Sequence, residues 1–557
     1  MTKEMNILIA GEAGQGTDYI GKHLGAFFSE QGLWAYVYRD YGSVIRGGHN
    51  FVVVKVSEEE VFATDNEIDI LIALNSESLK HIKKLKKNGI LICARECKLF
   101  KKVKTILLPF SEIENKFGKI FLNTACISAL LTVLNYDIRD FLKLLPKRRE
   151  ENKKVAEFIV NYVRENYSKM IEAKKKKMAK KGELVSGNDA ISFGMISAGL
   201  ERYYAYPMTP ATGILHTLAA KQKEFGFALQ PENEIAVISM ALGSAYSGKV
   251  SAVATSGGGF DLMHESLSFA GMAEIPILVI DSQRASSSTG LPTYSGQADM
   301  LSAIYAGHGE FPRIVAAPSC NEEAYEKSAE LLKLAWKFQV PTILLSDKNL
   351  SEHYKTSRFK KIDKIKLNLA KGNRRYKITR TGISPLIIPG IKNSVVKVSS
   401  YEHDEYGFTT EDPCITSKMQ EKRAKKIEAI IMEMKKLETV KTYGDKNSEN
   451  IVIAWGSVVS QLRESLKYMN KKIKIIQPIY LEPFPIWEFD LKKAKNIILV
   501  EQNKNNQLAY LLKKEGIIVN KSILKYDGRP FFPKELAKQI ENKMKISDSE
   551  NNCKKRK

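Results

Sequence analysis

An acidic pair opens one of the most apolar helix-length stretches of the chain. Glu232 and Glu234 come just before a run of almost entirely apolar residues. Carboxylates in the first turn of a helix usually do no more than balance the helix dipole. Glu234, however, leads into an apolar face at Ile235, Ile238 and Leu242, whose helical spacing indicates that its side chain faces the interior. A buried carboxyl group of this kind is a candidate for proton transfer.

A threonine enclosed by prolines follows a strand-length segment. Tyr206, Pro207, Thr209 and Pro210 precede a helix predicted at 211–220, so Thr209 stands at the carboxyl end of the strand. Open α/β sheets bind ligands at this end, and the prolines restrict the backbone that presents the hydroxyl group. From these five positions alone, an ordinary Thr-Pro turn is the better-supported interpretation.

Two further strand ends carry side chains that suit ligand binding. Thr255, Ser256 and Gly257 follow a short apolar strand, and glycine there permits a ligand to approach the backbone closely. Arg284 follows the next predicted strand, where its guanidinium group can bind a carboxylate through two parallel hydrogen bonds. Taken alone, Arg284 suits a structural ion pair equally well.

A glycine-rich turn lies between the first predicted strand and helix. Gly11, Gly14 and Gly16 have the spacing Gly-x-x-Gly-x-Gly, which differs from the Gly-x-Gly-x-x-Gly pattern of dinucleotide sites. A structural tight turn is therefore at least as well supported as a nucleotide site.

The elements that must position these residues form three series. Strand-length apolar runs alternate with amphipathic helix-length segments at 6–167, 186–347 and 451–540. This alternation is typical of parallel sheets covered by helices. A basic segment at 172–183 separates the first two series, and an irregular connector with a helix at 419–437 separates the last two. We therefore predict an α/β protein with three doubly wound, Rossmann-like domains.

Charge and apolar content exclude several classes of function. The net charge of +23 permits nucleic acid, membrane or an acidic protein as a partner, but the lysines are spread along the chain, as on a solvated surface. No recognition helix, aromatic stripe or zinc spacing accompanies them. The longest apolar run, 121–134, is shorter than the roughly 20 residues of a membrane span, and the N-terminus lacks the apolar length of a signal peptide. We expect no nucleic-acid partner, no membrane association and a cytoplasmic location.

Cysteine usage limits the metal chemistry of this chain. Six cysteines in 557 residues provide neither a disulfide framework nor the four closely spaced thiolates of an iron–sulfur cluster. We expect no metal or cluster on this chain alone.

In their order along the chain, these motifs resemble the α subunit of the 2-oxoacid:acceptor (ferredoxin) oxidoreductases. The four that carry the resemblance are 206–210, 232–235, 255–257 and 283–284 followed by 288–293. The turn 11–16 and the motif 41–49 are similar to the family's γ subunit, which is often fused ahead of α. Shorter matches extend the resemblance over nearly the whole chain: 381–385, 389–390, 402–407, 422–423, 455–457, 483–485 and 501–503.

The resemblance implies a shared active site. This subunit would hold the aminopyrimidine ring of thiamine diphosphate. A β subunit would bring the fold that binds the diphosphate and Mg²⁺, and a [4Fe-4S] cluster. In agreement, the Gly-Asp-Gly…Asn-Asn signature of the diphosphate-binding fold is absent from the sequence. The cofactor-binding residues implied are Tyr206, Pro207, Pro210, Glu234, Thr255, Ser256 and Gly257.

The resemblance also implies a reaction. A 2-oxoacid and coenzyme A would give acyl-CoA, CO2 and reduced ferredoxin. Glu234 would hydrogen-bond N1′ of the pyrimidine ring, Thr209 would hydrogen-bond the substrate, and Arg284 would face its carboxylate or the coenzyme A thiol. Ser288 and Thr289 would complete the substrate side. Departures from the family pattern at 285–287 and 211–212 leave the substrate open, including aryl or branched 2-oxoacids such as indolepyruvate or 2-oxoisovalerate.

The resemblance divides the chain into six segments. We predict a γ-type domain at 1–171, a basic linker at 172–185 and a pyrimidine-binding domain at 186–350. A connector at 351–443, a transketolase C-terminal-like domain at 444–545 and a basic tail at 546–557 follow.

Overall fold

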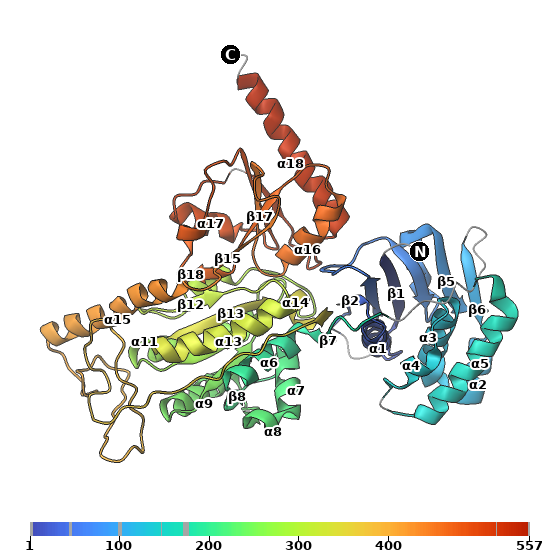
Figure 1. Ribbon diagram of the computed structural model, residues 1–557. Helices are drawn as coiled ribbons and strands as arrows, with labels where there is room; N and C mark the ends of the chain where they lie inside the picture. The colour runs from blue at the N-terminus through green and yellow to red at the C-terminus, as the bar shows by residue number, and fades with distance from the viewer. Residues whose placement is uncertain are drawn as a thin grey trace. The chain divides into compact units, whose positions relative to one another are not determined.

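The computed structural model describes residues 4–43, 47–97, 103–145, 147–170, 178–519 and 521–554, with side chains up to residue 545. Val44, Ile45 and Arg46 of the motif at 41–49, residues 172–177 of the linker and the side chains of the tail lie outside the described residues. The chain forms two compact units (Figure 1). The first comprises Met1–Ser186, Glu352–Arg358 and Phe532–Lys534, and the second comprises Gly187–Ser351, Phe359–Phe531 and Glu535–Lys557.

The first unit contains a mixed sheet of eight strands. In spatial order they are β6 (Lys104–Leu108), β5 (Leu85–Ala94), β4 (Ile68–Ala73), β1 (Glu4–Glu12), β3 (His49–Ser57), β2 (Trp34–Asp40), β14 (Tyr354–Ser357) and β7 (Glu183–Ser186). The half from β6 to β1 is parallel, and the other half is antiparallel. The strands β7 and β14 join this sheet from segments far along the chain.

Helices bury the apolar faces of this first sheet. They are α1 (Thr17–Glu30), α2 (Phe110–Phe117), α3 (Leu122–Val133), α4 (Ile138–Leu142) and α5 (Arg149–Tyr167), with short 3₁₀ turns η1 (Glu77–Lys84), η2 (Lys119–Phe121) and η3 (Ser168–Met170). Almost every residue of α3 is buried, which explains why its sequence is apolar on all sides.

The second unit begins with a seven-stranded sheet that is parallel except at one edge. Its order is β18 (Tyr480–Glu482), β12 (Ile314–Ala316), β13 (Pro341–Asp347), β11 (Ile277–Gln283), β10 (Ser251–Thr255), β8 (Arg202–Tyr204) and β9 (Phe227–Leu229). The central strands β10, β11 and β13 are buried along their whole length. Strands covered on both faces are continuous apolar runs, which is the pattern that the sequence has here.

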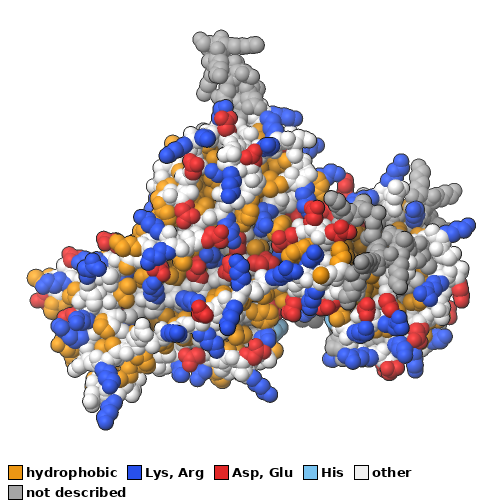
Figure 2. Space-filling view, in the orientation of Figure 1, with side chains coloured by type: hydrophobic (Ala, Val, Ile, Leu, Met, Phe, Trp, Pro, Cys, Tyr) orange, Lys and Arg blue, Asp and Glu red, His pale blue; other side chains and the backbone are white. Residues whose placement is uncertain are grey.

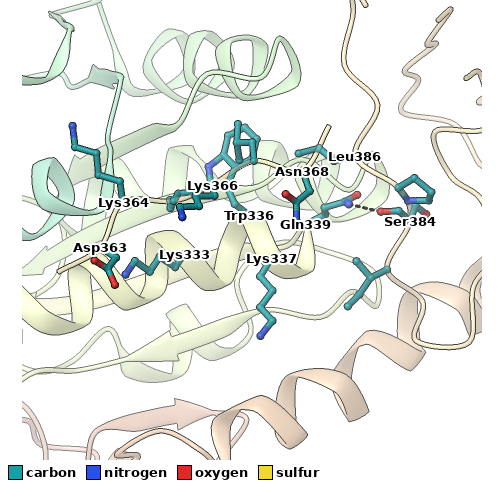
Figure 3. Close-up of a pocket in the computed structure, with 14 residues that line it drawn as sticks. Lys333, Trp336, Lys337, Gln339, Asp363, Lys364, Lys366, Asn368, Ser384 and Leu386 are labelled. Atoms are coloured by element: carbon teal, nitrogen blue, oxygen red, sulfur yellow. Dashed lines mark hydrogen bonds between the residues drawn. The ribbon is translucent and has the colours of Figure 1, made fainter. Parts of the chain in front are cut away.

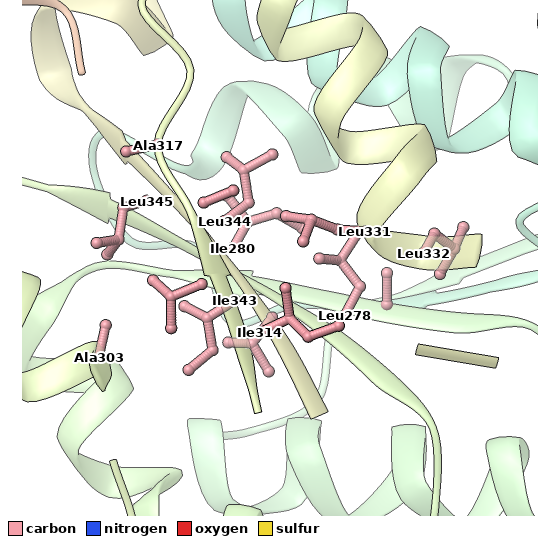
Figure 4. Packing of buried hydrophobic residues seen from close by; sticks show 14 of the residues in the cluster. Leu278, Ile280, Ala303, Ile314, Ala317, Leu331, Leu332, Ile343, Leu344 and Leu345 are labelled. Atoms are coloured by element: carbon pink, nitrogen blue, oxygen red, sulfur yellow. The ribbon is translucent and has the colours of Figure 1, made fainter. Parts of the chain in front are cut away.

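Helices cover this second sheet. They are α6 (Gly187–Ala198), α7 (Thr212–Ala220), α8 (Gln222–Phe225), α9 (Glu234–Tyr246), α10 (Gly257–Leu262), α11 (His264–Met272), α12 (Met300–Ile304), α13 (Asn321–Phe338) and α14 (Lys348–Glu352). Figure 4 shows how Leu331 and Leu332 of α13 pack with Leu278, Ile280 and Leu344 of the strands. This core makes the sheet a rigid support for the loops at its edges.

A third sheet of five strands completes the second unit. Its order is β15 (Val440–Gly444), β17 (Lys474–Pro478), β16 (Asn450–Ile453), β19 (Asn496–Glu501) and β20 (Lys521–Leu524), and only β15 is antiparallel. Its helices are α16 (Val458–Ser465), η4 (Leu466–Tyr468), η5 (Ile486–Glu488), α17 (Gln507–Lys514) and α18 (Pro533–Lys554). The amide of Gln297 joins it to the second sheet by a 3.0 Å hydrogen bond to the carbonyl of Trp455.

The connector between these sheets is held by a buried charge cluster. Its helix α15 (Pro413–Met434) presents Lys422 and Lys426 to the carboxylate of Glu274, which precedes β11. Arg375 of the irregular part donates to the backbone carbonyl of Glu274 at 3.0 Å. The two lysines hold the pKa of Glu274 well below its usual range, against the opposing effect of its burial. The irregular connector therefore has a fixed attachment to the second sheet.

The predicted α/β architecture is confirmed in all three sheets. Among the described residues, no helix has both the length and the apolar character that crossing a bilayer requires. On the face in Figure 2, Lys and Arg side chains are scattered among acidic and apolar ones and do not form one continuous patch.

Candidate functional site

Three neighbouring parallel strands bring the motifs of the second unit to one sheet edge. The strands β8, β10 and β11 run in the same direction, and Thr255 at the end of β10 pairs in register with Asp281 of β11. The segment of Thr209 follows β8, Gly257 follows β10, and Arg284 follows β11. Because carboxyl ends of parallel strands meet at one edge, residues 75 positions apart in sequence, such as Thr209 and Arg284, come together there.

Glu234 is the first residue of α9 and is buried, with 4% of its surface exposed. The side chain of Asn233 caps the helix by accepting a hydrogen bond from the amide of Ala236 at 2.9 Å. The buried face runs through Val237, Ile238, Ala241 and Leu242. Ile235, which the sequence analysis assigned to this face, is 53% exposed. The face begins at Glu234 itself, because residues at i+3 and i+4 share a side with residue i.

The Glu234 carboxyl group has an unsatisfied oxygen. Its Oε1 is buried and has no hydrogen-bond partner among the described residues. A Cβ at Gly259 would lie 2.6 Å from this atom and 2.1 Å from Oγ1 of Thr255, so only glycine fits there. A buried polar atom without a partner costs free energy unless a ligand satisfies it. The position therefore fits a donor on a bound ring, such as a protonated ring nitrogen.

The loop after β10 offers further polar atoms. Thr255 is fully buried, and its hydroxyl lies 3.9 Å from the sulfur of Met208. Ser256 is also fully buried, and its hydroxyl has no partner among the described residues. The segment after β8 and the loop after β10 thus touch, with uncommitted hydroxyl and carboxyl groups between them.

Arg284 bridges two loops through backbone carbonyls. Its Nη1 donates to the carbonyl of Thr209 at 3.4 Å and its Nη2 to the carbonyl of Ser288 at 3.2 Å. Its Nε is buried without an acceptor, and in the described chain no carboxylate lies within 4.0 Å of the guanidinium group. Arg284 therefore makes no direct ion pair with Asp281 or Asp299, although its charge acts on both carboxyl groups at longer range. The charge of Arg284 remains available for an anion.

Three further polar residues at this edge are not among the predicted site residues. Asp281 is fully buried, both its oxygens lack partners, and burial together with Asp299 raises its pKa well above the usual value. Burial, reinforced by Asp261, raises the pKa of Asp299 to about 6. Thr293 has a buried hydroxyl without a partner. Asp281 could have been found as a single acid inside an otherwise apolar strand, and Thr293 as the last residue of the motif 288–293, whereas Asp299 had no signal.

The remaining predicted site residues are more exposed. Tyr206 and Pro207 lie at the surface of the segment that carries Thr209, and the Thr209–Pro210 peptide bond is cis. Ser288 and Thr289 are exposed; Ser288 contributes its carbonyl to Arg284, and no contact ties Thr289 to the site, so its role stays a prediction. In the described part of the chain, no group of three or more His, Cys, Asp or Glu side chains is arranged to hold a metal ion.

The glycine-rich turn belongs to the first unit. It joins β1 to α1, and Gly14 and Gly16 adopt positive φ angles of 97° and 75°. Such angles favour glycine, which accounts for these two positions as a tight turn. The tight turn explains these two glycines without a bound ligand.

Two family models match the chain. The one described as pyruvate ferredoxin/flavodoxin oxidoreductase matches residues 6–169. The one described as pyruvate flavodoxin/ferredoxin oxidoreductase, thiamine diphosphate-binding, matches residues 193–422 and so includes the edge that carries Glu234 and Arg284.

Proteins with related names are similar to this chain over 65% to 97% of its length. A 2-oxoacid:ferredoxin oxidoreductase α subunit from a Sulfolobus species is 30% identical and covers 96% of each chain. A 2-oxoglutarate synthase subunit from Methanocaldococcus jannaschii is 29% identical over 65% of this chain and 99% of its own. The solved 2-oxoglutarate:ferredoxin oxidoreductase from Magnetococcus marinus, with 2-oxoglutarate, coenzyme A and succinyl-CoA bound, has a TM-score of 0.87 at 28% identity, covering 97% of this chain and 100% of that one. The chain therefore belongs to the family of 2-oxoacid:ferredoxin oxidoreductase α subunits.

Proposed function

We propose that this chain is the α subunit, with a fused γ-type domain, of a thiamine-diphosphate-dependent oxidoreductase that converts a 2-oxoacid and coenzyme A to acyl-CoA and CO2 and reduces ferredoxin. The observation that carries the proposal is the buried Glu234, whose Oε1 lacks a partner and faces a glycine turn. The family to which the chain belongs supports the reaction type.

The residues at this edge suit the aminopyrimidine ring of the cofactor. Thiamine diphosphate supplies an electron sink for the electron pair that remains when the carboxylate of a 2-oxoacid leaves as CO2. Glu234 would hold a hydrogen bond to N1′ of the ring, exchanging a proton through Oε1. Thr255, Ser256 and Gly257 would line the ring, with Tyr206, Pro207 and Pro210 on the neighbouring loop.

Thr209 and Arg284 would bind the substrate. The guanidinium group is held by two neutral carbonyls and keeps its charge, so it can pair with the carboxylate of a 2-oxoacid or with coenzyme A. Thr209 would present its hydroxyl to the substrate beside it. Ser288 and Thr289 would border the same anion from the loop that Arg284 already contacts.

A β subunit would complete the site. The chain lacks the diphosphate-binding signature and the cysteine spacing of a cluster, so that partner would supply the fold that binds the diphosphate and Mg²⁺, and the [4Fe-4S] cluster. The large side chains exposed near Glu234 support an interface here. Ile235 of α9 is 53% exposed and Leu262 of α10 is 50% exposed, so apolar side chains on both helices are accessible to a partner.

The 2-oxoacid itself is proposed at the level of class. The similar solved structure contains 2-oxoglutarate and succinyl-CoA, which favours a dicarboxylic substrate. Ala285, Ser286 and Ser287 stand after Arg284 where the family often has Gly-Gly-Pro. An aryl or branched substrate is therefore the second candidate. We also propose the six segments given above as the functional divisions of the chain.

A reconstitution experiment tests the division of labour. The purified chain alone should neither decarboxylate 2-oxoglutarate nor reduce ferredoxin, whereas adding its β subunit should restore both activities. Pyruvate, 2-oxoisovalerate and indolepyruvate, assayed in parallel, identify the substrate. Full activity of the iron-free chain by itself would disprove the proposal.

A further inference from the structure

A groove of about 910 Å³ lies where the connector crosses the end of α13. Its wall is formed by Lys333 and Trp336 of the helix and by the extended segments 363–368 and 383–386. Figure 3 shows Lys333, Lys364 and Lys366 toward one end, Asn368 and Leu386 toward the other, and Trp336 between them. Its volume is within the range of small-molecule pockets.

This groove is separate from the site that carries Glu234 and Arg284. Its residue Gln339 stands directly before β13, whereas Arg284 stands directly after β11. Because β11 and β13 are parallel and pair in register, Gln339 lies at the amino-terminal ends of the strands and Arg284 at their carboxyl-terminal ends. The groove and the candidate active site also share no lining residue.

One end of the groove, which also holds Asp363, carries more lysines than carboxylates (Figure 3). In the described chain, Lys333, Lys364 and Lys366 have no carboxylate within 4.0 Å of their ammonium groups. The fourth lysine, Lys337, pairs with Glu433 at 2.6 Å. Asp363 is the single acidic residue of the lining. Three ammonium groups around one hollow favour an anion with several oxygen atoms, such as a phosphate chain.

The remaining part of the groove is apolar with two uncommitted polar groups. Ile383 and Leu386 line this part together with Trp336, which is 4% exposed. The indole nitrogen of Trp336 is buried and donates to no acceptor among the described residues. The amide of Asn368 makes no hydrogen bond in this part of the chain either. Apolar walls with unpaired amide and indole groups suit a flat heterocycle better than an alkyl chain, which offers no hydrogen bonds.

We propose that this groove is a binding site for a nucleoside phosphate, with its phosphates at Lys333, Lys364 and Lys366 and its base between Trp336 and Leu386. The site is independent of the proposed catalytic function, since it lies at the other sheet edge. It assigns a ligand to the connector, which otherwise only links two sheets.

Calorimetric titration of the full-length chain with ADP tests the proposal. ADP should bind, and Lys364→Gln with Lys366→Gln should weaken the binding at least about tenfold, because each lysine contributes a charge-assisted hydrogen bond. The matched control is Lys360→Gln with Lys361→Gln, which removes the same charge from the same segment outside the groove and should leave the affinity unchanged. Inorganic phosphate, which lacks the base, should bind at least about tenfold more weakly than ADP.

Tryptophan fluorescence gives a second readout. ADP should change the emission of the wild-type chain, and Trp336→Phe should abolish that change. The proposal is overturned if ADP does not bind, or if it binds equally to the Lys364→Gln, Lys366→Gln variant, as it would if it occupied a coenzyme A site. Equal affinity for phosphate and ADP would overturn the role of the base.

Discussion

Arg284 donates a 3.4 Å hydrogen bond to the backbone carbonyl of Thr209, although the two residues follow different strands of the sheet. A neutral carbonyl holds the guanidinium group in place without cancelling its charge. In the described chain no carboxylate lies close enough to do so. The contact therefore joins two loops and keeps a cation at the edge where an anionic substrate would bind.

Arg284→Lys should reduce kcat/KM for the 2-oxoacid or for coenzyme A roughly 10- to 150-fold in the assembled enzyme. Losing one charge-assisted hydrogen bond costs about 1.5–3 kcal/mol, because the single ammonium group of lysine cannot reproduce the forked donors. The reactant whose kcat/KM falls is the one that Arg284 faces. Arg380→Lys, at an exposed position, is the control. A lower melting temperature with wild-type kinetics would instead assign a structural role.

Glu234→Gln should lower turnover by about 10²–10⁴-fold, the usual loss when a general acid–base group is removed. Assembly with the β subunit should persist, because glutamine has the same size. Glu232→Gln changes an exposed carboxylate two residues away and should leave turnover unchanged. The measurements are turnover, size-exclusion elution and calorimetric affinity for thiamine diphosphate. An assembled Glu234→Gln enzyme with normal turnover would remove Glu234 from the mechanism.

Asp281→Asn should make the protein's stability less dependent on pH. Burial and Asp299 raise the folded-state pKa of Asp281 above the ordinary value of 3.8. The folded chain thus keeps a proton that the unfolded chain releases, and the free energy of unfolding falls as pH rises above ~4, by at most about 1.4 kcal/mol per pH unit.

The wild-type melting temperature should therefore drop more than that of Asp281→Asn between about pH 5 and about pH 8. Scanning calorimetry at both pH values measures the difference. Parallel pH dependence in the two proteins would mean that Asp281 ionises normally in the fold.

Glu274→Gln should destabilise the second unit by about 3–5 kcal/mol, because it leaves Lys422 and Lys426 buried without their counter-charge. Burial already lowers the pKa of Lys426 to about 8, so the cluster depends on the carboxylate. Glu224→Gln is the matched control, since it breaks an exposed pair with Lys221, where the loss should stay below about 1 kcal/mol. Denaturant unfolding of both variants checks the contrast. Similar losses would mean that the buried cluster contributes no more than a surface pair.

Much of the local structure could be predicted from the sequence. The predicted alternation of apolar strand-length runs with amphipathic helix-length segments is present in the series at 186–347, which contains α13, and at 451–540, which contains β19. Helical periodicity predicted that Glu234 is buried, and the resemblance assigned Glu234 and Arg284 to one site. These features depend on residues close together in the chain or on motifs that follow one another in a fixed order along it.

Long-range pairing was decided only by the tertiary structure. Strands β7 and β14 join the first sheet, and β18 joins the second, although each is too short to signal its partner. Three other features likewise depend on segments far apart in sequence. They are the exposure of Ile235, the contact of Arg284 with Thr209, and the groove lined by Lys333, Lys364 and Lys366. Local patterns determine which face of an element is apolar. Which elements meet, and which polar atoms are then left without partners, is determined by packing of the whole chain.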